Sequence, residues 1–217
     1  IVFLVRAGNP KGIRDWGDLA RDGVGVITPN PKTSGGARWN YLAARAWAER
    51  HHAVDAAAVE GYLRRMLANV PVLDTGARGS TTTFAQRGIG DVLVTWENEA
   101  WLAKAQFARA GLEIVYPSLS IRAEPPVAVV DANVDTAGTR ALAEAYLAFL
   151  YTGPAQAIIA RHHYRPAQTD VAGADRFPAI ELVDIDDAFG GWAAAHDAHF
   201  RDGASFDRIM AAIAAQR

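Results

Sequence analysis

Ser34-Gly35-Gly36 is the segment whose residue types and spacing best fit a chemical task. A β-type run at 24–28 precedes it, and alanine-rich sequence with helical spacing follows it from Ala37. This order predicts a strand, a turn and a helix, with the glycines at the start of the helix. The first N–H groups of a helix have no partner inside it, and the helix dipole adds partial positive charge there. Because glycine has no Cβ, an oxyanion can approach these N–H groups, so the segment is typical of an anion-binding turn.

Two better-known phosphate-binding motifs do not fit this segment. A P-loop requires G-x-x-x-x-G-K-[ST], whereas here Lys32 precedes the glycines and Arg38 follows them. A dinucleotide fingerprint requires G-x-G-x-x-G, a spacing that the segment lacks. On the local sequence alone, an ordinary turn in which Ser34 serves as the helix N-cap is an equal alternative.

Two further turns carry hydrogen-bond donors after predicted strands. The turn Gly76-Ala77-Arg78 follows a run at 70–73, and Trp96 ends a buried run at 88–96. Ligands of open α/β sheets bind at the carboxyl ends of strands, so we expect both turns to meet the Ser34 turn there. Backbone N–H groups, the Ser34 hydroxyl and the Trp96 indole are donors, and a site lined by donors alone suits an unprotonated oxyanion such as sulfate. Core packing of Trp96 is the competing interpretation.

Other candidate chemistry is weaker. Arg38, in the first turn of the predicted helix, is either a counter-charge behind the glycines or a surface side chain. His196 and His199 are three residues apart without a third ligand at a helpful spacing, so neither a metal nor another cofactor is predicted. Ser34 lacks the G-x-S-x-G context of a hydrolase nucleophile, and no other catalytic constellation stands out. We therefore predict no catalytic residue and no enzyme.

Composition narrows the class of protein. The chain has 217 residues, 50% of them hydrophobic, which is enough to bury a sizeable core. Its net charge of -2 gives no reason to expect a nucleic acid or an anionic membrane as a partner. The absence of cysteine excludes thiol nucleophiles, cysteine metal sites and disulfides.

Strands and helices alternate in the first half of the chain, which indicates an α/β domain with a mainly parallel sheet. Beyond Pro117 the pattern of strands and helices changes. A single predicted strand at 127–130 is followed by predicted helices, and these elements do not make a sheet of their own. We expect this half to complete a domain that other sequence begins. The predicted strands are 1–5, 24–28, 70–73, 88–96, 112–116 and 127–130, and the predicted helices are 37–52, 55–67, 80–86, 97–110, 139–151, 155–163 and one from 205.

Several stretches, in order along the whole chain, resemble the periplasmic sulfate-binding protein family, whose members serve sulfate/thiosulfate ABC importers. Among them are SGGARWNYLAA, WENEA and FGGW. The matching residues are 1–6, 9–11, 26–32, 34–44, 90–93, 96–100, 164–166 and 189–192.

The resemblance implies a type II solute-binding fold, in which two α/β domains close on the ligand about a two-strand hinge. By position, residues 1–6 would be a hinge strand and 7–117 the complete second domain. Residues 118–217 would be the return hinge and the C-terminal half of the first domain, whose N-terminal half would lie upstream of Ile1. That half-domain is expected to expose apolar surface.

The same resemblance implies the ligand contacts. They fall on Ser34, Gly35, Gly36, Ala77 and Trp96. Arg38 would be a supporting residue behind the turn Ser34-Gly35-Gly36, which we call the anion cradle. Family members hold the dehydrated dianion by hydrogen bonds, mostly from main-chain N–H groups, without a directly paired cation.

The function implied is capture of sulfate or thiosulfate in the periplasm by a protein that is a monomer when complete. Its partners would be the membrane permease and ATPase subunits of an ABC importer, without nucleic acid. Three alternatives stay open: a binding protein for another tetrahedral oxyanion such as molybdate or phosphate, an enzyme acting on a phospho-compound, or a truncated fragment that cannot bind because one wall of its cleft is missing.

Overall fold

The structure, a computed structural model, describes residues 1–53 and 55–216 and forms two compact units. The first unit combines Ile1–Ala123 with Ile180–Arg217, and the second is Glu124–Ala179. The first unit crosses the boundary expected at 117, because residues after 180 pack on the helices of the first half. The division into segments 1–6, 7–117 and 118–217 stays a prediction.

A five-stranded sheet in the order β3-β2-β4-β1-β5 lies at the centre of the first unit. β2 runs parallel to both β3 and β4, whereas β1 runs antiparallel to β4 and β5. The sheet is therefore mixed rather than mainly parallel, since a buried apolar run does not encode the direction of its strand. The strands are β1 (Val2–Val5), β2 (Val26–Pro29), β3 (Leu73–Asp74), β4 (Val92–Thr95) and β5 (Glu113–Val115).

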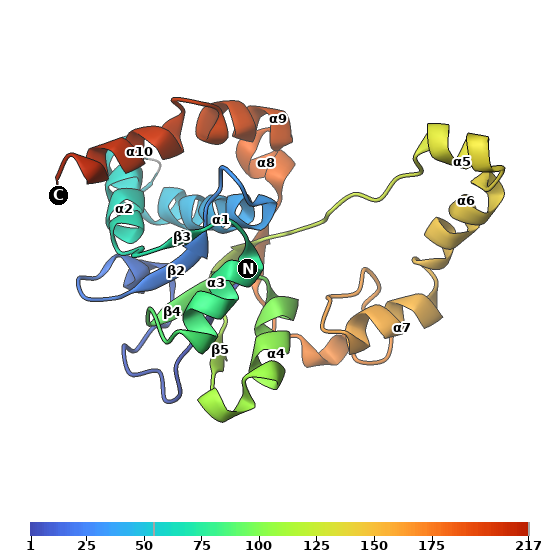
Figure 1. Cartoon of the computed structure of the whole chain (residues 1–217), viewed down its shortest axis with the longest axis horizontal. Coiled ribbons are helices and arrows are strands. Elements are labelled where there is room, and N and C mark those ends of the chain that lie inside the picture. The colour runs from blue at the N-terminus through green and yellow to red at the C-terminus, as the bar shows by residue number, and fades with distance from the viewer. Residues whose placement is uncertain (54, 217) are drawn as a thin grey trace. The chain divides into compact units, whose positions relative to one another are not determined.

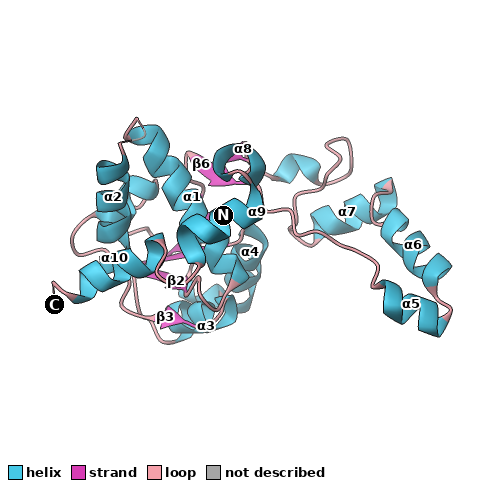
Figure 2. Ribbon diagram, turned by 90° about the horizontal axis from the view of Figure 1, so that it is seen from above, coloured by secondary structure: helices cyan, strands magenta, loops and turns pink. Residues whose placement is uncertain are grey.

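Helices cover both faces of this sheet, and the two faces have separate cores (Figures 1 and 2). Along β1, Phe3 and Val5 pack into one core while Val2 and Leu4 pack into the other. Burial on both sides explains why β1 is an unbroken apolar run. One core holds α1 (Gly35–His51), α2 (Ala56–Ala68), α9 (Gly191–Ala195) and α10 (Ser205–Ala214), and the other holds α4 (Glu97–Gln106).

Gly90 fixes the closeness of β2 and β4 just before β4 begins. Its φ is +80°, and a Cβ on it would lie 2.6 Å from Cγ1 of Ile27. Both the backbone angle and the contact require glycine at this position. The Arg6 guanidinium holds the same turn by donating to the Gly90 and Ile89 carbonyls.

A second, two-stranded sheet belongs to the same unit, although the sequence did not suggest it. β6 (Leu119–Ile121) and β7 (Glu181–Val183) pair in parallel, and β6 packs against α1. The Trp16 indole donates to the Leu119 carbonyl over 2.7 Å, which ties this sheet to the main core. The shorter elements of the unit are α3 (Ala77–Thr81), α8 (Ile185–Phe189), 3₁₀ helices at Trp16–Ala20 and Ala108–Ala110, and π-helical turns at Thr82–Gln86 and His196–Phe200.

The second unit is built from helices alone. The strand predicted at 127–130 is wrong: this segment follows Pro125 and Pro126 and has no neighbouring strand in the unit to pair with. Arg140 joins the first two helices through ion pairs with Asp131 and Asp135. The helices are α5 (Asp131–Ala137), α6 (Arg140–Phe149), α7 (Gly153–Arg161) and a 3₁₀ helix at Ala174–Arg176.

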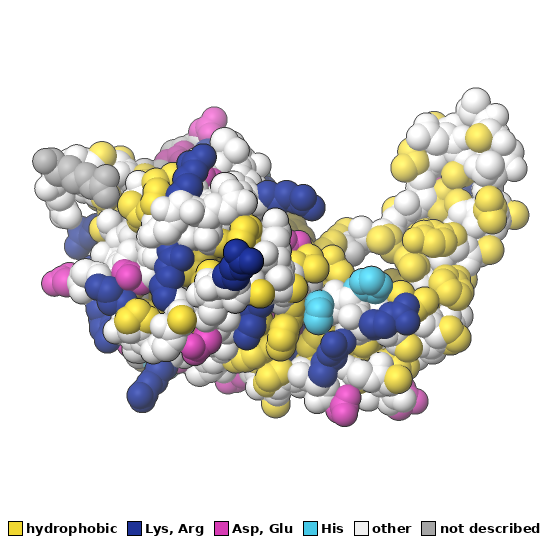
Figure 3. Space-filling view, turned by 60° about the horizontal axis from the view of Figure 1, so that its bottom comes forward, with side chains coloured by type: hydrophobic (Ala, Val, Ile, Leu, Met, Phe, Trp, Pro, Cys, Tyr) yellow, Lys and Arg dark blue, Asp and Glu magenta, His cyan; other side chains and the backbone are white. Residues whose placement is uncertain are grey.

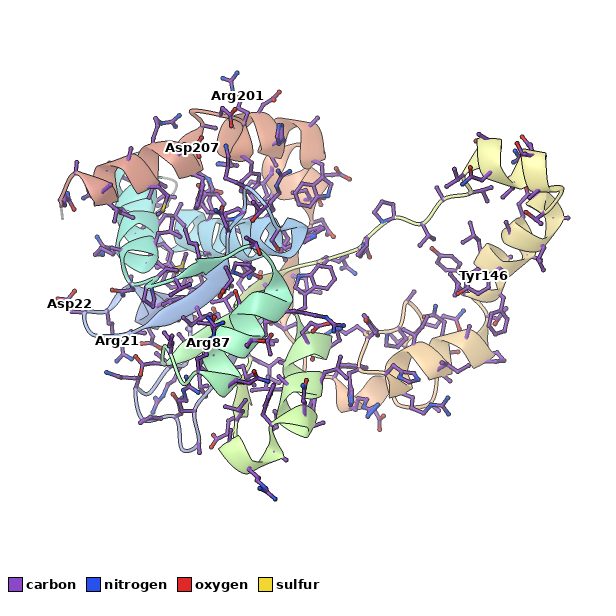
Figure 4. The ribbon with its side chains drawn as sticks, in the orientation of Figure 1. Arg21, Asp22, Arg87, Tyr146, Arg201 and Asp207 are labelled. Atoms are coloured by element: carbon purple, nitrogen blue, oxygen red, sulfur yellow. The ribbon has the colours of Figure 1, made fainter. Side chains whose placement is uncertain are left out.

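The second unit exposes one apolar helix face. Leu142, Tyr146 and Phe149 recur on α6 at helical spacing and are 72%, 60% and 46% exposed. Hydrophobic side chains of this unit lie on the surface in Figure 3, and Figure 4 labels Tyr146 on α6. The expectation of exposed apolar surface is thus confirmed for residues 124–179. Other large exposed apolar side chains of the unit are Val127, Val130, Tyr151, Ile158 and Tyr164.

Within 1–53 and 55–216, no helix combines the length and the apolar character that crossing a membrane would require.

The α6 face predicts how the 217-residue chain behaves in solution. Leu142→Glu combined with Tyr146→Glu should lower its binding of a fluorescent apolar dye, because both substitutions interrupt one contiguous apolar surface. Leu102→Glu on α4, where the replaced side chain is 50% exposed, is the matched control and should change dye fluorescence little. Equal fluorescence of the parent and the double variant would contradict the assignment of the dye-binding surface to α6.

Candidate functional site

The start of α1 is an N-capped turn that leaves two glycine N–H groups without an intrahelical partner. Ser34 is the N-cap, and its Oγ accepts from the Ala37 N–H over 3.3 Å. Gly35 and Gly36 occupy the first two helical positions, so helix geometry gives their N–H groups no acceptor inside the helix. The N-cap role of Ser34 is therefore compatible with an anion-binding turn. The Ser34 hydroxyl accepts from Ala37 through its oxygen and keeps its proton to donate.

The missing side chain of Gly36 leaves a space toward which other donors converge. A Cβ at Gly36 would lie 3.3 Å from Nε1 of Trp96 and 3.8 Å from Oγ of Ser34. Trp96 reaches this place from the end of β4, where it directly precedes α4. Two side-chain donors from different elements thus face the first turn of α1.

A pocket opens at this space and brings the predicted turns together. The pocket has about 210 Å³ of empty space, part of which is open to solvent. Gly36, Ala77 and Trp96 all line it, whereas Ser34 and Gly35 do not. The lining residues are Pro29, Gly36, Asn40, Ala77, Ser80, Leu93, Val94, Thr95 and Trp96.

Three of the polar atoms that line the pocket are buried and have no partner among the described residues. Trp96 Nε1, Ser80 Oγ and Asn40 Oδ1 are buried and have no hydrogen-bond partner in the described part of the chain. A buried polar atom without a partner costs about 1–3 kcal/mol, so three such atoms in one pocket indicate that a polar ligand or water completes them.

Asn40 and Ser80 escaped the sequence analysis. The amide nitrogen of Asn40 donates to Oγ1 of Thr28 and to the Val94 carbonyl, which leaves its oxygen free of those bonds. The sequence predicted a site lined by donors alone, but the Asn40 amide oxygen is an acceptor and the Ser80 hydroxyl can also accept. Asn40 lies four positions after Gly36, and Ser80 lies three positions after Ala77. Residues at these spacings share one face of a helix, so helical spacing from the two predicted contacts could have identified both.

Ala77 is the first residue of α3, and the nearby carboxylate lies outside the pocket lining. Gly76 caps this helix, and the Ser80 N–H donates to the Gly76 carbonyl over 3.2 Å. Asp74 does not line the pocket, and its Oδ1 accepts from the Thr83 hydroxyl over 3.0 Å. No acid or base is thus among the lining residues.

Arg38 lies behind the first turn of α1 rather than in the pocket. Its Nε donates to the Pro31 carbonyl over 3.0 Å, and its guanidinium carbon lies 5.2 Å from the centre of the Phe200 ring. None of the lining side chains is ionisable. A ligand of this pocket would meet hydrogen-bond donors and helix dipoles rather than a paired cation.

The His199 ring packs among aromatic side chains in the core beneath α1. Its ring packs against Tyr41 and Phe200, with centroid distances of 5.6 and 6.0 Å. In the described residues, no three His, Cys, Asp or Glu side chains are placed to hold a metal ion. Burial, with smaller contributions from Arg45 and Arg208, lowers the pKa of His199 to about 4.

Comparison with known proteins places this architecture among binding proteins. A family profile described as bacterial extracellular solute-binding protein matches residues 1–165. A sulfate-binding protein from Salmonella typhimurium is 56% identical over 211 residues, which is 96% of this chain and 64% of that protein. A thiosulfate-binding protein from Pseudomonas aeruginosa is 48% identical over 210 residues, 96% of this chain and 63% of that protein. The chain thus spans less than two thirds of these relatives.

A solved structure agrees with the fold. The sulfate-binding protein SubI from Mycobacterium tuberculosis matches with a TM-score of 0.76 and 38% sequence identity, over 92% of this chain and 68% of SubI. A Bordetella ferric binding protein matches at 19% identity with a TM-score of 0.57, which concerns the fold alone.

The lowered pKa of His199 predicts a pH dependence of stability. Because folding disfavours its charged form, the free energy of unfolding should fall by up to about 1.4 kcal/mol per pH unit between pH 6.5 and about 4, as the unfolded chain gains a proton there. His199→Gln should flatten this slope relative to the parent in urea unfolding at several pH values. His196→Gln, which changes an exposed side chain of the same turn, is the control. An unchanged slope in His199→Gln would contradict the assignment.

Proposed function

The chain belongs to the family of bacterial extracellular solute-binding proteins, and on that premise we propose that it binds sulfate or thiosulfate as the solute-binding component of an ABC importer. The proposal concerns the whole protein, because the chain spans 64% of its Salmonella relative. Similarity to proteins named for sulfate and for thiosulfate supports a sulfur oxyanion and keeps both ions as candidates.

One observation carries the proposal: the space left by the missing Cβ of Gly36. Trp96 Nε1 and Ser34 Oγ both lie within 4 Å of that Cβ position, at the start of a 17-residue helix. N–H groups at a helix start and two converging side-chain donors form an arrangement that attracts an oxyanion.

The proposed ligand contacts are the Ser34 hydroxyl, the N–H groups of Gly35, Gly36 and Ala77, and the indole N–H of Trp96. Arg38 supports the cradle through the Pro31 carbonyl without reaching the pocket. Neutral donors can hold a dianion because each hydrogen bond to a charged oxygen is about twice as strong as one to a neutral oxygen.

The proposed setting follows from the family. The protein would act outside the cytoplasmic membrane, in the periplasm, as a monomer that delivers its anion to permease and ATPase subunits. Catalysis is not proposed, because a general acid or base would have to reach the anion and none lines the pocket.

An anion panel tests the function. In thermal unfolding, a ligand raises stability by RT ln(1 + [L]/Kd), so sulfate or thiosulfate should raise the Tm of the protein, produced at the length of its relatives, more than molybdate or phosphate does. A larger shift with phosphate or molybdate would favour another oxyanion, and no shift with any of them would reject the proposal. The 217-residue chain alone should bind sulfate weakly or not at all, and micromolar binding would show that it needs no further wall.

Gly36→Ala should nearly abolish sulfate binding while the protein still folds. The added methyl would stand 3.3 Å from Trp96 Nε1, in the space assigned to the anion. We expect at least about a 100-fold rise in Kd by calorimetry, since a steric clash removes several donors at once. Gly61→Ala on α2, whose Cβ would meet the Arg65 side chain, is the control and should leave Kd unchanged. Near-parent affinity of Gly36→Ala would place the anion elsewhere.

Trp96→Phe should keep the ring but lose the indole donor. The expected loss is about 1–2 kcal/mol of sulfate binding free energy, because one buried donor is removed. Trp101→Phe, the same exchange within α4 and away from the pocket lining, is the control for calorimetry. Equal affinity of Trp96→Phe and the parent would remove Trp96 from the site.

A further inference from the structure

The loop 30–34 joins β2 to the anion cradle, and one side of it is fastened to the turn before Ala77. The Asn30 N–H donates to the Asp74 carbonyl over 2.8 Å. The Thr33 hydroxyl donates to the Thr75 carbonyl over 3.0 Å. These bonds set the distance between two of the turns that face the pocket.

The Lys32 ammonium fastens the other side of the loop to the C-terminal segment. Its Nζ lies 3.0 Å from the Phe200 carbonyl oxygen, 2.9 Å from Oδ1 of Asp202 and 3.0 Å from Oδ2 of Asp207. An ammonium has three donors, and three oxygens surround this one. Oδ2 of Asp207 also accepts from the Gly203 N–H over 2.9 Å, so the segment 200–207 folds around the charge.

Burial decides which of these bonds matters most. The Asp202 side chain is fully exposed, whereas those of Asp207 and Lys32 are only 33% and 27% exposed. Water therefore screens the ion pair with Asp202 more strongly, and we assign the larger part of the electrostatic attraction on Lys32 to Asp207. Hydrogen bonds to Asp202 and Asp207 raise the pKa of Lys32, and the bond from Lys32 lowers that of Asp207, so both groups of this pair stay charged at neutral pH.

The same segment holds the first turns of α1. Phe200 lies under the Arg38 guanidinium, and the Tyr41 hydroxyl donates to the Ser205 hydroxyl over 3.2 Å. Asp207, at the start of α10, is labelled in Figure 4. The segment 200–207 therefore contacts the loop before the cradle and the helix after it.

We propose that Lys32 is a positioning residue of the anion site: its ammonium clamps segment 200–207 onto loop 30–34 and so fixes Ser34, Gly35 and Gly36 for the anion. Lys32 does not line the pocket, and its donors are directed at oxygens of the C-terminal segment. The clamp acts by preorganisation, because donors bind an ion best when they already stand within about 0.5 Å of their bound positions. This inference rests on the proposed function.

Sulfate calorimetry on the protein at the length of its relatives tests the clamp. Lys32→Met should raise Kd about tenfold, since binding must then also order the loop. Lys32→Arg should restore Kd to within about threefold of the parent, because a guanidinium can still donate hydrogen bonds to the Phe200 carbonyl and the Asp207 carboxylate. Lys104→Met, the same exchange on α4 and away from the pocket lining, is the matched control and should leave Kd unchanged.

The partner of the clamp is tested by a double-mutant cycle. Asp207→Asn should weaken sulfate binding more than Asp202→Asn does, because Asp207 is the more buried carboxylate. Lys32→Met combined with Asp207→Asn should bind no more weakly than Lys32→Met alone, as expected of two groups that act through one contact. Additive losses would overturn the pairing.

Amide hydrogen exchange in the absence of sulfate gives a reading that is independent of the ligand. The amides of Thr33, Ser34 and Ala37 make hydrogen bonds within the cradle and should exchange faster in Lys32→Met than in Lys104→Met, while amides of the central sheet stay unchanged.

The outcomes separate the clamp from the proposed function. Parent-like Kd and parent-like exchange in a folded Lys32→Met variant would overturn the clamp. If the parent itself does not bind sulfate, the proposed function fails and the exchange measurement still decides the clamp. If Lys32→Met does not fold, Asp207→Asn decides by the same two measurements, and parent-like values there would overturn it.

Discussion

The parallel pairing of β2 with β4 decides where every part of the pocket can lie. Val26 pairs with Val92 and Ile27 with Leu93, so both strands end at the same edge of the sheet. One strand then leads into the start of α1 and the other into Trp96. β3 runs parallel on the far side of β2 and brings the turn before Ala77 to that edge as well. Gly90 makes the pairing possible, because any side chain there would collide with Ile27.

Charge is arranged around this edge so that none of it enters the pocket. The pocket is lined by uncharged residues, while Lys32 and Arg38 lie behind the first turn of α1 and are already engaged with oxygens and an aromatic ring. A bare cation inside a small pocket would attract any anion. Neutral N–H groups held at fixed positions instead discriminate by shape and by the proton that a ligand carries. The amide oxygen of Asn40 adds an acceptor to these donors, and the hydrogen bonds from its amide nitrogen to Thr28 and Val94 fix where that oxygen points.

Local patterns predicted the elements that carry the pocket, and distant contacts set the rest. The β2–α1 junction, the Ser34 cap and the strand before Trp96 have strong short-range signals, and the solute-binding fold predicted from resemblance is confirmed by the match to SubI. The roles assigned to the cradle residues stay predictions. β6 and β7 are three residues long and lie about 60 positions apart, so neither has a periodicity to detect. Ser80 could not be recognised from its own segment, because the pocket that it lines is completed by Trp96 from another turn of the chain.

The contacts of Lys32 limit when the start of α1 can be completed as the chain is synthesised and folds. Lys32 and Asp207 are 175 residues apart in sequence, so a ribosome must produce α10 before that pair can form. Contacts of such long range form late in folding, because a large loop has to close first. The first turn of α1 therefore gains its last support only after nearly all the other elements have been made.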